Sequence, residues 1–150
     1  MLFAQRKITI VRVQASESVV SLGDDGRVGE ADDDSGRQSF VLSPVDGGEY
    51  LIRTAPDGSD RGVLCWRATS NGTDPLTVTG AACSAADGRQ RFTVTPLGRS
   101  GSRPTYAIAN QGAYLQYSAK WSLILQEAGD AALSTTFRLV DNGAAPTTAG

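Results

Sequence analysis

Short stretches of alternating apolar and polar residues recur along the whole chain, separated by turn-forming Gly, Pro, Asn and Asp residues. Alternation with a period of two is typical of half-buried β-strands, and no segment sustains the 3.6-residue period of a helix. The pattern predicts twelve strands in three groups of four. Their expected ranges are 7–13, 18–22, 27–30 and 38–42; 49–53, 63–67, 76–79 and 91–95; and 105–108, 114–117, 122–126 and 137–140.

The fourth strand of each group carries a related motif. Residues 88–94 read GRQRFTV, residues 36–42 read GRQSFVL, and residues 134–139 read STTFRL. The phenylalanines of these motifs, Phe40, Phe92 and Phe137, are 52 and 45 residues apart. A repeat of this length indicates radially repeated β units, and closing the sheet on itself removes exposed strand edges. We therefore expect an all-β β-trefoil with pseudo-threefold symmetry.

The same period assigns the repeats and the core. One domain over residues 1–143 is expected, with repeats at about 5–47, 48–98 and 103–143 and a flexible tail at 144–150. Residues two apart in a strand share a face, so each closing phenylalanine should point inward together with the residue two positions later. The expected core contains Phe40 with Leu42, Phe92 with Val94, Phe137 with Leu139, and around them Ile8, Tyr50, Leu64, Tyr106 and Leu115.

Composition and charge narrow the range of functions. The formal net charge is -2 and the isoelectric point is about 5.0, which gives no basic face for binding nucleic acid. No apolar run is long enough to span a bilayer, so no membrane insertion is expected. The N-terminus lacks the basic segment followed by an apolar segment that is typical of a signal peptide. The chain has no histidine, which removes histidine-based nucleophile activation and histidine metal ligation. We expect a non-enzymatic protein without a cofactor or metal.

The second repeat carries a resemblance to a known family. Gly62-Val63-Leu64-Cys65-Trp66, followed by Cys83 and Arg89-Gln90-Arg91-Phe92, is similar to the ricin B-like (R-type) lectin repeat, which has two cysteines and closes on Gln-x-Trp or Gln-x-Phe. Gln38-Ser39-Phe40 matches the same close, whereas Thr135-Thr136-Phe137 keeps only the aromatic residue. The resemblance implies a β-trefoil that binds galactose-like or related sugars in shallow pockets, up to one in each repeat.

The sequence departs from the lectin pattern at one position that the family uses for binding. In that family an aspartate just after the first cysteine accepts hydrogen bonds from the sugar. Here Trp66 and Arg67 follow Cys65, Gln116 and Tyr117 follow Leu115, and Ser21 and Leu22 follow Val20. Loss of a charge-assisted hydrogen bond costs roughly 1.5–3 kcal/mol, a large part of the affinity of a millimolar site.

The third repeat offers the best candidate for a sugar site. Tyr117 and Trp121 flank a tight connection at a predicted hairpin tip, and aromatic rings of this kind can stack on sugar faces. Gln116 and Gln126 could supply hydrogen bonds on either side. The alternative is that Trp121 folds back as a cap over the barrel. The first hypothesis is therefore a glycan-binding module that acts through Gln116, Tyr117, Trp121 and Gln126.

Cys65 and Cys83 are 18 residues apart on neighbouring predicted strands. A disulfide between them would stabilise the fold by roughly 3 kcal/mol, and two free buried thiols are the alternative. Disulfides persist in oxidising compartments, so this pairing predicts a secreted or extracytoplasmic protein.

Three other features have plainer interpretations. Gln38 and Gln90 are expected to satisfy backbone groups of loops rather than to contact a ligand. The acidic run 30–34 is expected to be a solvated loop and not a calcium site, because it lacks spaced oxygen ligands. Segment 96–104 is expected to be a long exposed loop that carries Arg99 and Arg103. A second hypothesis follows from it: a protein-binding trefoil with decayed sugar sites, either a protease inhibitor or a subunit of a larger assembly.

Overall fold

The computed structural model describes residues 5–14, 18–32, 36–55, 62–70, 72, 75–100, 103–127 and 135–144. This part of the chain forms twelve β-strands and two short 3₁₀ turns, so every predicted strand is present. The strands are β1 (Arg6–Arg12), β2 (Val19–Leu22), β3 (Val28–Ala31), β4 (Phe40–Pro44), β5 (Tyr50–Thr54), β6 (Cys65–Thr69), β7 (Thr77–Ala81), β8 (Phe92–Ser100), β9 (Arg103–Asn110), β10 (Ala113–Ser118), β11 (Ser122–Glu127) and β12 (Phe137–Ala144).

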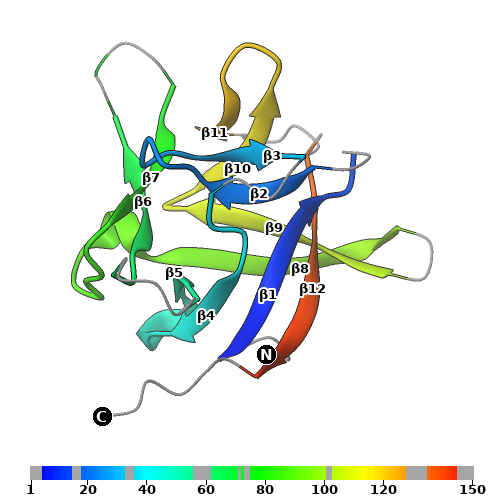
Figure 1. The fold of residues 1–150 in the computed structure, drawn as a ribbon, viewed down its shortest axis with the longest axis horizontal. Helices are drawn as coiled ribbons and strands as arrows, with labels where there is room; N and C mark the ends of the chain where they lie inside the picture. The colour runs from blue at the N-terminus through cyan, green and yellow to red at the C-terminus, as the bar shows by residue number, and fades with distance from the viewer. Residues whose placement is uncertain are drawn as a thin grey trace.

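Six of the strands close into a barrel (Figure 1). β1 pairs with β12 and β4, β5 pairs with β4 and β8, and β9 pairs with β8 and β12, all of them antiparallel. This ring consists of the first and last strands of each repeat. Because the ring is closed, each of these six strands lies between two neighbouring strands, as expected from the sequence repeat.

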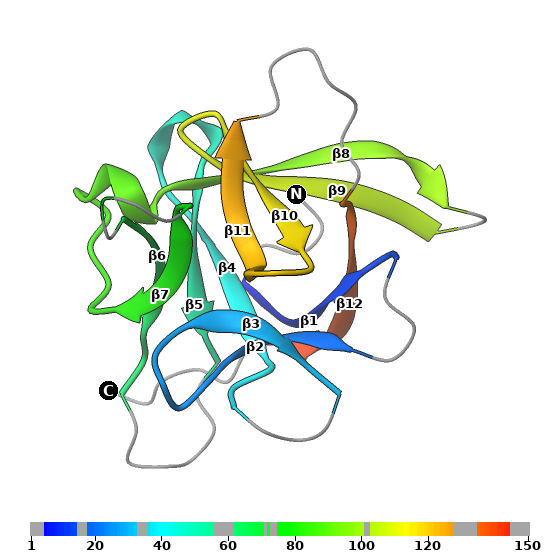
Figure 2. The same ribbon diagram turned by 90° about the horizontal axis from the view of Figure 1, so that it is seen from above.

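The other six strands form three hairpins, β2–β3, β6–β7 and β10–β11, which lie over one end of the barrel (Figure 2). Each hairpin contacts the next through the carbonyl of a turn residue. The contacts are Gly80 N to Gly26 O at 2.9 Å, Leu125 N to Leu76 O at 2.8 Å, and the Arg27 Nη2 group to Trp121 O. The third junction therefore uses an arginine side chain where the other two use a backbone amide.

The core is filled by aromatic and branched side chains from all three repeats. Trp66 is fully buried, with the rings of Phe40 and Phe92 packed edge-on against it at centroid distances of 5.3 and 5.9 Å. The predicted inward pairs Phe40–Leu42, Phe92–Val94 and Phe137–Leu139 are all buried, which confirms the predicted core layer. Tyr50 and Leu64 are only partly buried and pack against its edge.

Two predicted boundaries are wrong, and both errors concern segments rich in turn residues. Residues 96–100 and 103–104 of the predicted loop lie in strands, because β8 and β9 continue as a paired ribbon, with Arg99 opposite Pro104 and Ser100 opposite Arg103. A register shift between Pro96 and Arg99 accommodates the proline, which has no N–H to donate.

The last strand also runs further than expected. The expected strand ended at residue 140, but Asn142 and Gly143 also belong to β12, and Asn142 Nδ2 donates to Thr9 Oγ1 at 2.6 Å. Pairing with β1, which extends to Arg6 opposite Ala144, holds this segment in place. Residues 145–150, the rest of the predicted tail, lie outside the described part.

Candidate functional site

A polar cleft of about 260 Å³ lies between the β2–β3 hairpin and the tip of the β10–β11 hairpin. It therefore joins the first repeat to the third, and sequence reasoning did not anticipate it. Its lining provides hydroxyl, carboxylate and guanidinium groups together with backbone from Gly29. The polar lining residues are Ser21, Asp25, Arg27, Glu30 and Ser122.

Arg27 holds the two walls of the cleft together. Its backbone N–H donates to Asp25 Oδ1 at 3.0 Å, which fixes the turn before β3. Its Nη2 group donates to the carbonyl oxygens of Trp121 and Leu123, the latter at 3.2 Å. The Nε atom of Arg27 is buried and has no hydrogen-bond partner among the described residues. Arg27 is thus a positive group that lines the cleft and connects its two walls.

A second arginine neutralises the carboxylate at the other end of the cleft. Arg12 Nε and Nη2 donate to the two oxygens of Glu30 at 2.8 and 3.0 Å, and the two side chains are only 14% and 9% exposed. The Glu30 carboxylate, through this hydrogen bonding, raises the pKa of Arg12 above its ordinary value. The Arg12 guanidinium also lies 3.9 Å from the centroid of the Tyr117 ring. Asp25 is exposed, so it is the carboxylate at the cleft that is open to solvent.

Strand pairing identifies the equivalent outward position in each hairpin. Gly80 and Leu125 make the same contact to the preceding hairpin, and they pair with Trp66 and Leu115 respectively. Trp66 is therefore equivalent to Leu115, one position later than the sequence comparison assumed. The residues that follow the equivalent core positions, and point the other way, are Ser21, Arg67 and Gln116.

None of these three residues is a carboxylate, and in the second repeat the position is already engaged. Arg67 Nε donates to Asp87 Oδ2 at 2.8 Å, and this contact lowers the pKa of Asp87 below its ordinary value. Ser21 and Gln116 are both buried. The departure from the lectin pattern therefore holds with the corrected alignment.

The residues proposed for the third-repeat site come from one hairpin but do not share one face. Gln116 pairs with Ile124 and Gln126 pairs with Tyr114, so the two glutamines lie on the same face of β10–β11. Adjacent residues of a strand point to opposite faces, so Tyr117 lies on the other face, against Arg12. Tyr117 is 42% exposed, Gln126 is exposed, and Gln116 is 8% exposed.

Trp121 lies in the turn between β10 and β11 and is half-buried. Its backbone N–H donates to Ser118 Oγ at 3.3 Å, and its carbonyl accepts from Arg27. The amino group of Lys120 is 5.0 Å from the centroid of its ring. Trp121 directly precedes Ser122, which lines the cleft.

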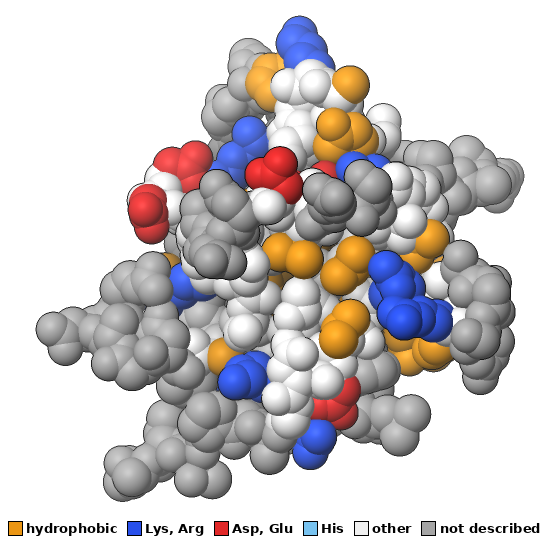
Figure 3. Space-filling model, turned by 45° about the vertical axis from the view of Figure 1, so that its right-hand side comes forward, with side chains coloured by type: hydrophobic (Ala, Val, Ile, Leu, Met, Phe, Trp, Pro, Cys, Tyr) orange, Lys and Arg blue, Asp and Glu red, His pale blue; other side chains and the backbone are white. Residues whose placement is uncertain are grey.

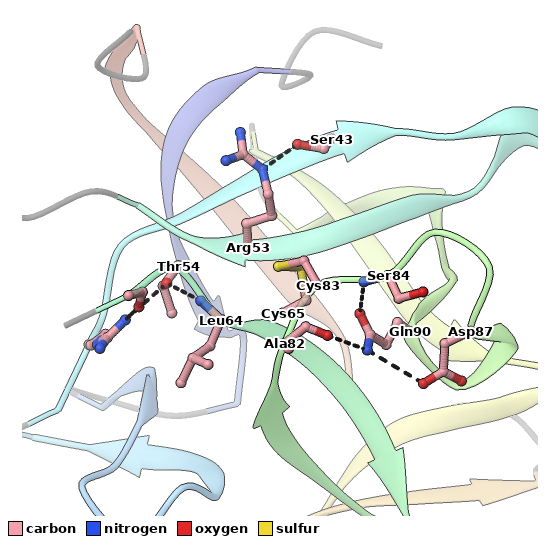
Figure 4. The surroundings of a disulfide bond; sticks show 12 residues. Ser43, Arg53, Thr54, Leu64, Cys65, Ala82, Cys83, Ser84, Asp87 and Gln90 are labelled. Atoms are coloured by element: carbon pink, nitrogen blue, oxygen red, sulfur yellow. Dashed lines mark hydrogen bonds between the residues drawn. A yellow bond between two sulfur atoms is a disulfide. The ribbon is translucent and has the colours of Figure 1, made fainter. Parts of the chain in front are cut away.

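Cys65 and Cys83 form a disulfide, with their Cα atoms 5.0 Å apart (Figure 4). The bond ties the start of β6 to the loop before the second closing motif. Gln90 is buried beside it, and its Nε2 donates to Ala82 O while its Oε1 accepts from Ser84 N, both at 2.9 Å. This confirms the expected structural role of Gln90.

The third repeat meets the same need with a shorter side chain. Thr135, which replaces the glutamine of the other repeats, is buried, and its Oγ1 accepts the Tyr117 N–H at 3.0 Å. Gln38, the counterpart in the first repeat, is half-buried.

The remaining sequence candidates are placed as follows. Arg103 is exposed on β9, opposite Ser100, and Arg99 lies in β8. In the acidic run, Glu30 is held by Arg12, while Asp33 and Asp34 lie outside the described residues. No group of acidic, cysteine or histidine side chains suited to a metal ion occurs in the described ranges. Within the same ranges, no helix has the length and apolar character needed to cross a membrane.

Comparison with known proteins supports the fold. No protein-family model and no curated protein sequence matches the chain. Among solved structures, a designed threefold-symmetric protein, ThreeFoil, is 15% identical with a TM-score of 0.68, covering 90% of this chain and 98% of its own. The chain is a β-trefoil.

Two further solved structures have the same fold and are longer. A Polyporus squamosus lectin bound to the human-type influenza-binding epitope Neu5Acα2-6Galβ1-4GlcNAc is 12% identical, with a TM-score of 0.67. The protein in a PSL1a–E64 complex is 13% identical, with a TM-score of 0.66. Each match covers 91% of this chain but only 49% and 47% of the respective neighbour, so this β-trefoil spans about half their length.

Proposed function

We propose that this β-trefoil is a non-catalytic carbohydrate-binding module with weak affinity for glycans, and that it binds them mainly through its third repeat. The observation that carries the proposal is the polar cleft that Ser122 of the third repeat shares with the first repeat. The similarity of the fold to a glycan-bound lectin supports the same class of ligand. Galactose-like or related sugars are the proposed ligands, in line with the ricin B-like motifs.

The cleft has the mixture of donors and acceptors that a neutral sugar needs. Each sugar hydroxyl can donate one hydrogen bond and accept others, so a binding site requires both kinds of partner. Asp25 can accept, and the hydroxyl of Ser122 can either donate or accept. A sugar ring stacked on the Trp121 side chain at the hairpin tip would make apolar contact next to these groups.

Weak binding follows from what the cleft lacks. Both oxygens of Glu30 are already occupied by Arg12, so this carboxylate cannot act as the strong central acceptor. The pairing of Arg67 with Asp87 likewise closes the equivalent position of the second repeat. The carboxylate that stays open to solvent, Asp25, stands on an exposed turn, and its Oδ1 already accepts the Arg27 N–H. We therefore expect a monosaccharide to bind with a Kd of about 1 mM, or roughly -4 kcal/mol.

The disulfide between Cys65 and Cys83 is consistent with an extracellular location. We propose that the protein is secreted and that residues 1–143 act as one binding domain. Glycans on other molecules are then the natural ligands.

The deciding experiment is a glycan array followed by NMR titration, with the wild type compared to Trp121→Ala. This substitution keeps the backbone carbonyl that receives Arg27, so the fold should be retained. Leu97→Ala, which truncates an exposed large apolar residue on the β8–β9 ribbon, is the control. We expect binding by wild type and Leu97→Ala and a loss of at least about tenfold in Trp121→Ala.

The outcomes separate the site from the function. Binding that survives in Trp121→Ala but disappears in Asp25→Asn would retain the glycan proposal and move the site to the first-repeat wall of the cleft. A blank array from folded protein, together with no NMR shift changes on adding galactose, would reject carbohydrate binding altogether.

A second candidate function is a protein-binding module, and the observation that favours it is the β8–β9 ribbon, which extends beyond the barrel (Figure 1). If the module is a protease inhibitor, Arg99 or Arg103 would enter a trypsin-like cleft. The protein would then inhibit trypsin, and Arg99→Ala or Arg103→Ala would abolish the inhibition. Full trypsin activity in the presence of the protein would leave only the subunit version of this hypothesis.

A further inference from the structure

A groove of about 290 Å³ opens on the wall of the barrel between β9 and β12. The two strands pair at Tyr106 and Phe137 and then separate, because β9 follows β8 into the ribbon while β12 continues along β1. The groove is lined by Arg103 and Pro104 from β9 and by residues 138–141 from β12. It shares no lining residue with the cleft described above.

The edge of β12 that faces this groove has backbone groups available for pairing. Val13 N donates to Thr136 O, so residues 136, 138 and 140 direct their backbone groups toward β1. The alternate residues, beginning with Leu139, direct theirs away from β1 and toward the groove. Within the described residues β9 pairs with β12 only at Phe137, so the edge at Leu139 is left without a strand partner there.

The side chains around the groove combine apolar surface with positive charge. Pro104 is exposed and Val140 is 38% exposed. Figure 3, which views the molecule from the side of the ribbon, shows hydrophobic side chains at the surface beside a group of basic ones.

The charges at the groove are not balanced. Arg103 and Arg138 make no ion pair and no side-chain hydrogen bond among the described residues, whereas the carboxylate of Asp141 is paired with Arg6 Nε at 3.0 Å. The groove therefore presents two uncompensated cations, although the whole chain carries a formal net charge of -2. A partner with carboxylates would complement this local charge.

We propose that the groove binds an extended acidic peptide segment of a partner protein, which adds as a strand to the β12 edge at Leu139. Backbone hydrogen bonds to Leu139 would provide register, and apolar side chains of the peptide would lie on Pro104 and Val140. Carboxylates of the peptide would pair with Arg103 and Arg138. The interaction is separate from glycan binding, so free sugars should not compete with the peptide.

The test is selection from a phage-displayed library of random peptides about eight residues long, a length that covers the groove in extended form. The selected peptides are then synthesised and titrated into ¹⁵N-labelled full-length protein. We expect enrichment of sequences that alternate apolar and acidic residues, with amide shift changes at Leu139 and neighbouring residues of β12. Binding should weaken as salt is raised, since the pairs lie near the surface.

Charge reversal provides the matched comparison. Arg103→Glu, at an exposed position, should weaken the selected peptides on the order of fivefold. Arg89→Glu, which is also exposed but lies before β8 on the loop of the second closing motif, should leave their affinity unchanged. Arg138→Glu should act like Arg103→Glu, and its circular dichroism spectrum would report on folding.

Three results would overturn the proposal. One is the absence of any acidic enrichment in the library. Another is equal binding of the selected peptides to wild type and Arg103→Glu. The third is a concentration-dependent dimer in sedimentation that Arg103→Glu abolishes, because the groove would then hold a second copy of the chain.

Discussion

Removing the disulfide is the perturbation whose magnitude follows most directly from the structure. Cys65 is fully buried in β6, whereas Cys83 is exposed in the loop that precedes the second closing motif. Cys83→Ser therefore breaks the cross-link without leaving a cavity in the core. Cys65→Ala combined with Cys83→Ser breaks the same link and also removes a buried sulfur atom.

The expected cost comes from the chain entropy of the unfolded state. For a closed loop of 18 residues, the loss of the cross-link lowers the free energy of unfolding by roughly 3 kcal/mol at 25 °C. For a chain of this length, that corresponds to a fall in Tm of about 6–12 °C. The double variant should lose about 1 kcal/mol more, because of the void left at Cys65.

Urea denaturation followed by tryptophan fluorescence measures these differences. Wild-type protein treated with a reductant should coincide with Cys83→Ser, since both lose only the cross-link. A free energy of unfolding for Cys83→Ser within about 1 kcal/mol of the oxidised wild type would refute the entropic argument. It would mean that the hydrogen bonds of Gln90 hold the loop in place without the disulfide.

Two further predictions concern charged groups. Glu30→Gln should lower the free energy of unfolding by about 3 kcal/mol, because it leaves the largely buried Arg12 guanidinium, which lies beside Tyr117, without its carboxylate partner. Urea denaturation measures this loss. A loss below about 1 kcal/mol would show that the pair behaves as a surface ion pair. The pKa of Asp87 is lowered chiefly by Arg67, so its contribution to stability is present above its unfolded pKa of about 3.9 and is lost as pH falls through the lower folded value. Asp87→Asn should therefore make the Tm less dependent on pH below about pH 4, and a pH profile identical to that of the wild type would contradict this assignment.

The candidate sugar-binding residues of the third repeat show how far the sequence alone could be interpreted. The period-two rule already separates Gln116 from Tyr117, since neighbours in a strand face opposite ways, and applying it would have divided the predicted third-repeat set. The alignment of the repeats was wrong by one residue because the cysteine was matched to Leu115. The hydrogen bond between Leu125 and Leu76 corrects it, but that contact joins two repeats and is not visible in either one alone.

The amino-acid sequence by itself determined the strand order, the threefold repeat and the buried layer around Phe40, Phe92 and Phe137, because alternation and repetition are local properties of the chain. The tertiary structure alone decided the cleft between the hairpins, where Arg27 reaches Trp121 from a distant part of the sequence. It also decided that residues 96–100 and 103–104 form a paired ribbon and that β9 separates from β12. The physical reason is that sites of this kind depend on contacts between repeats, which form only when the barrel closes.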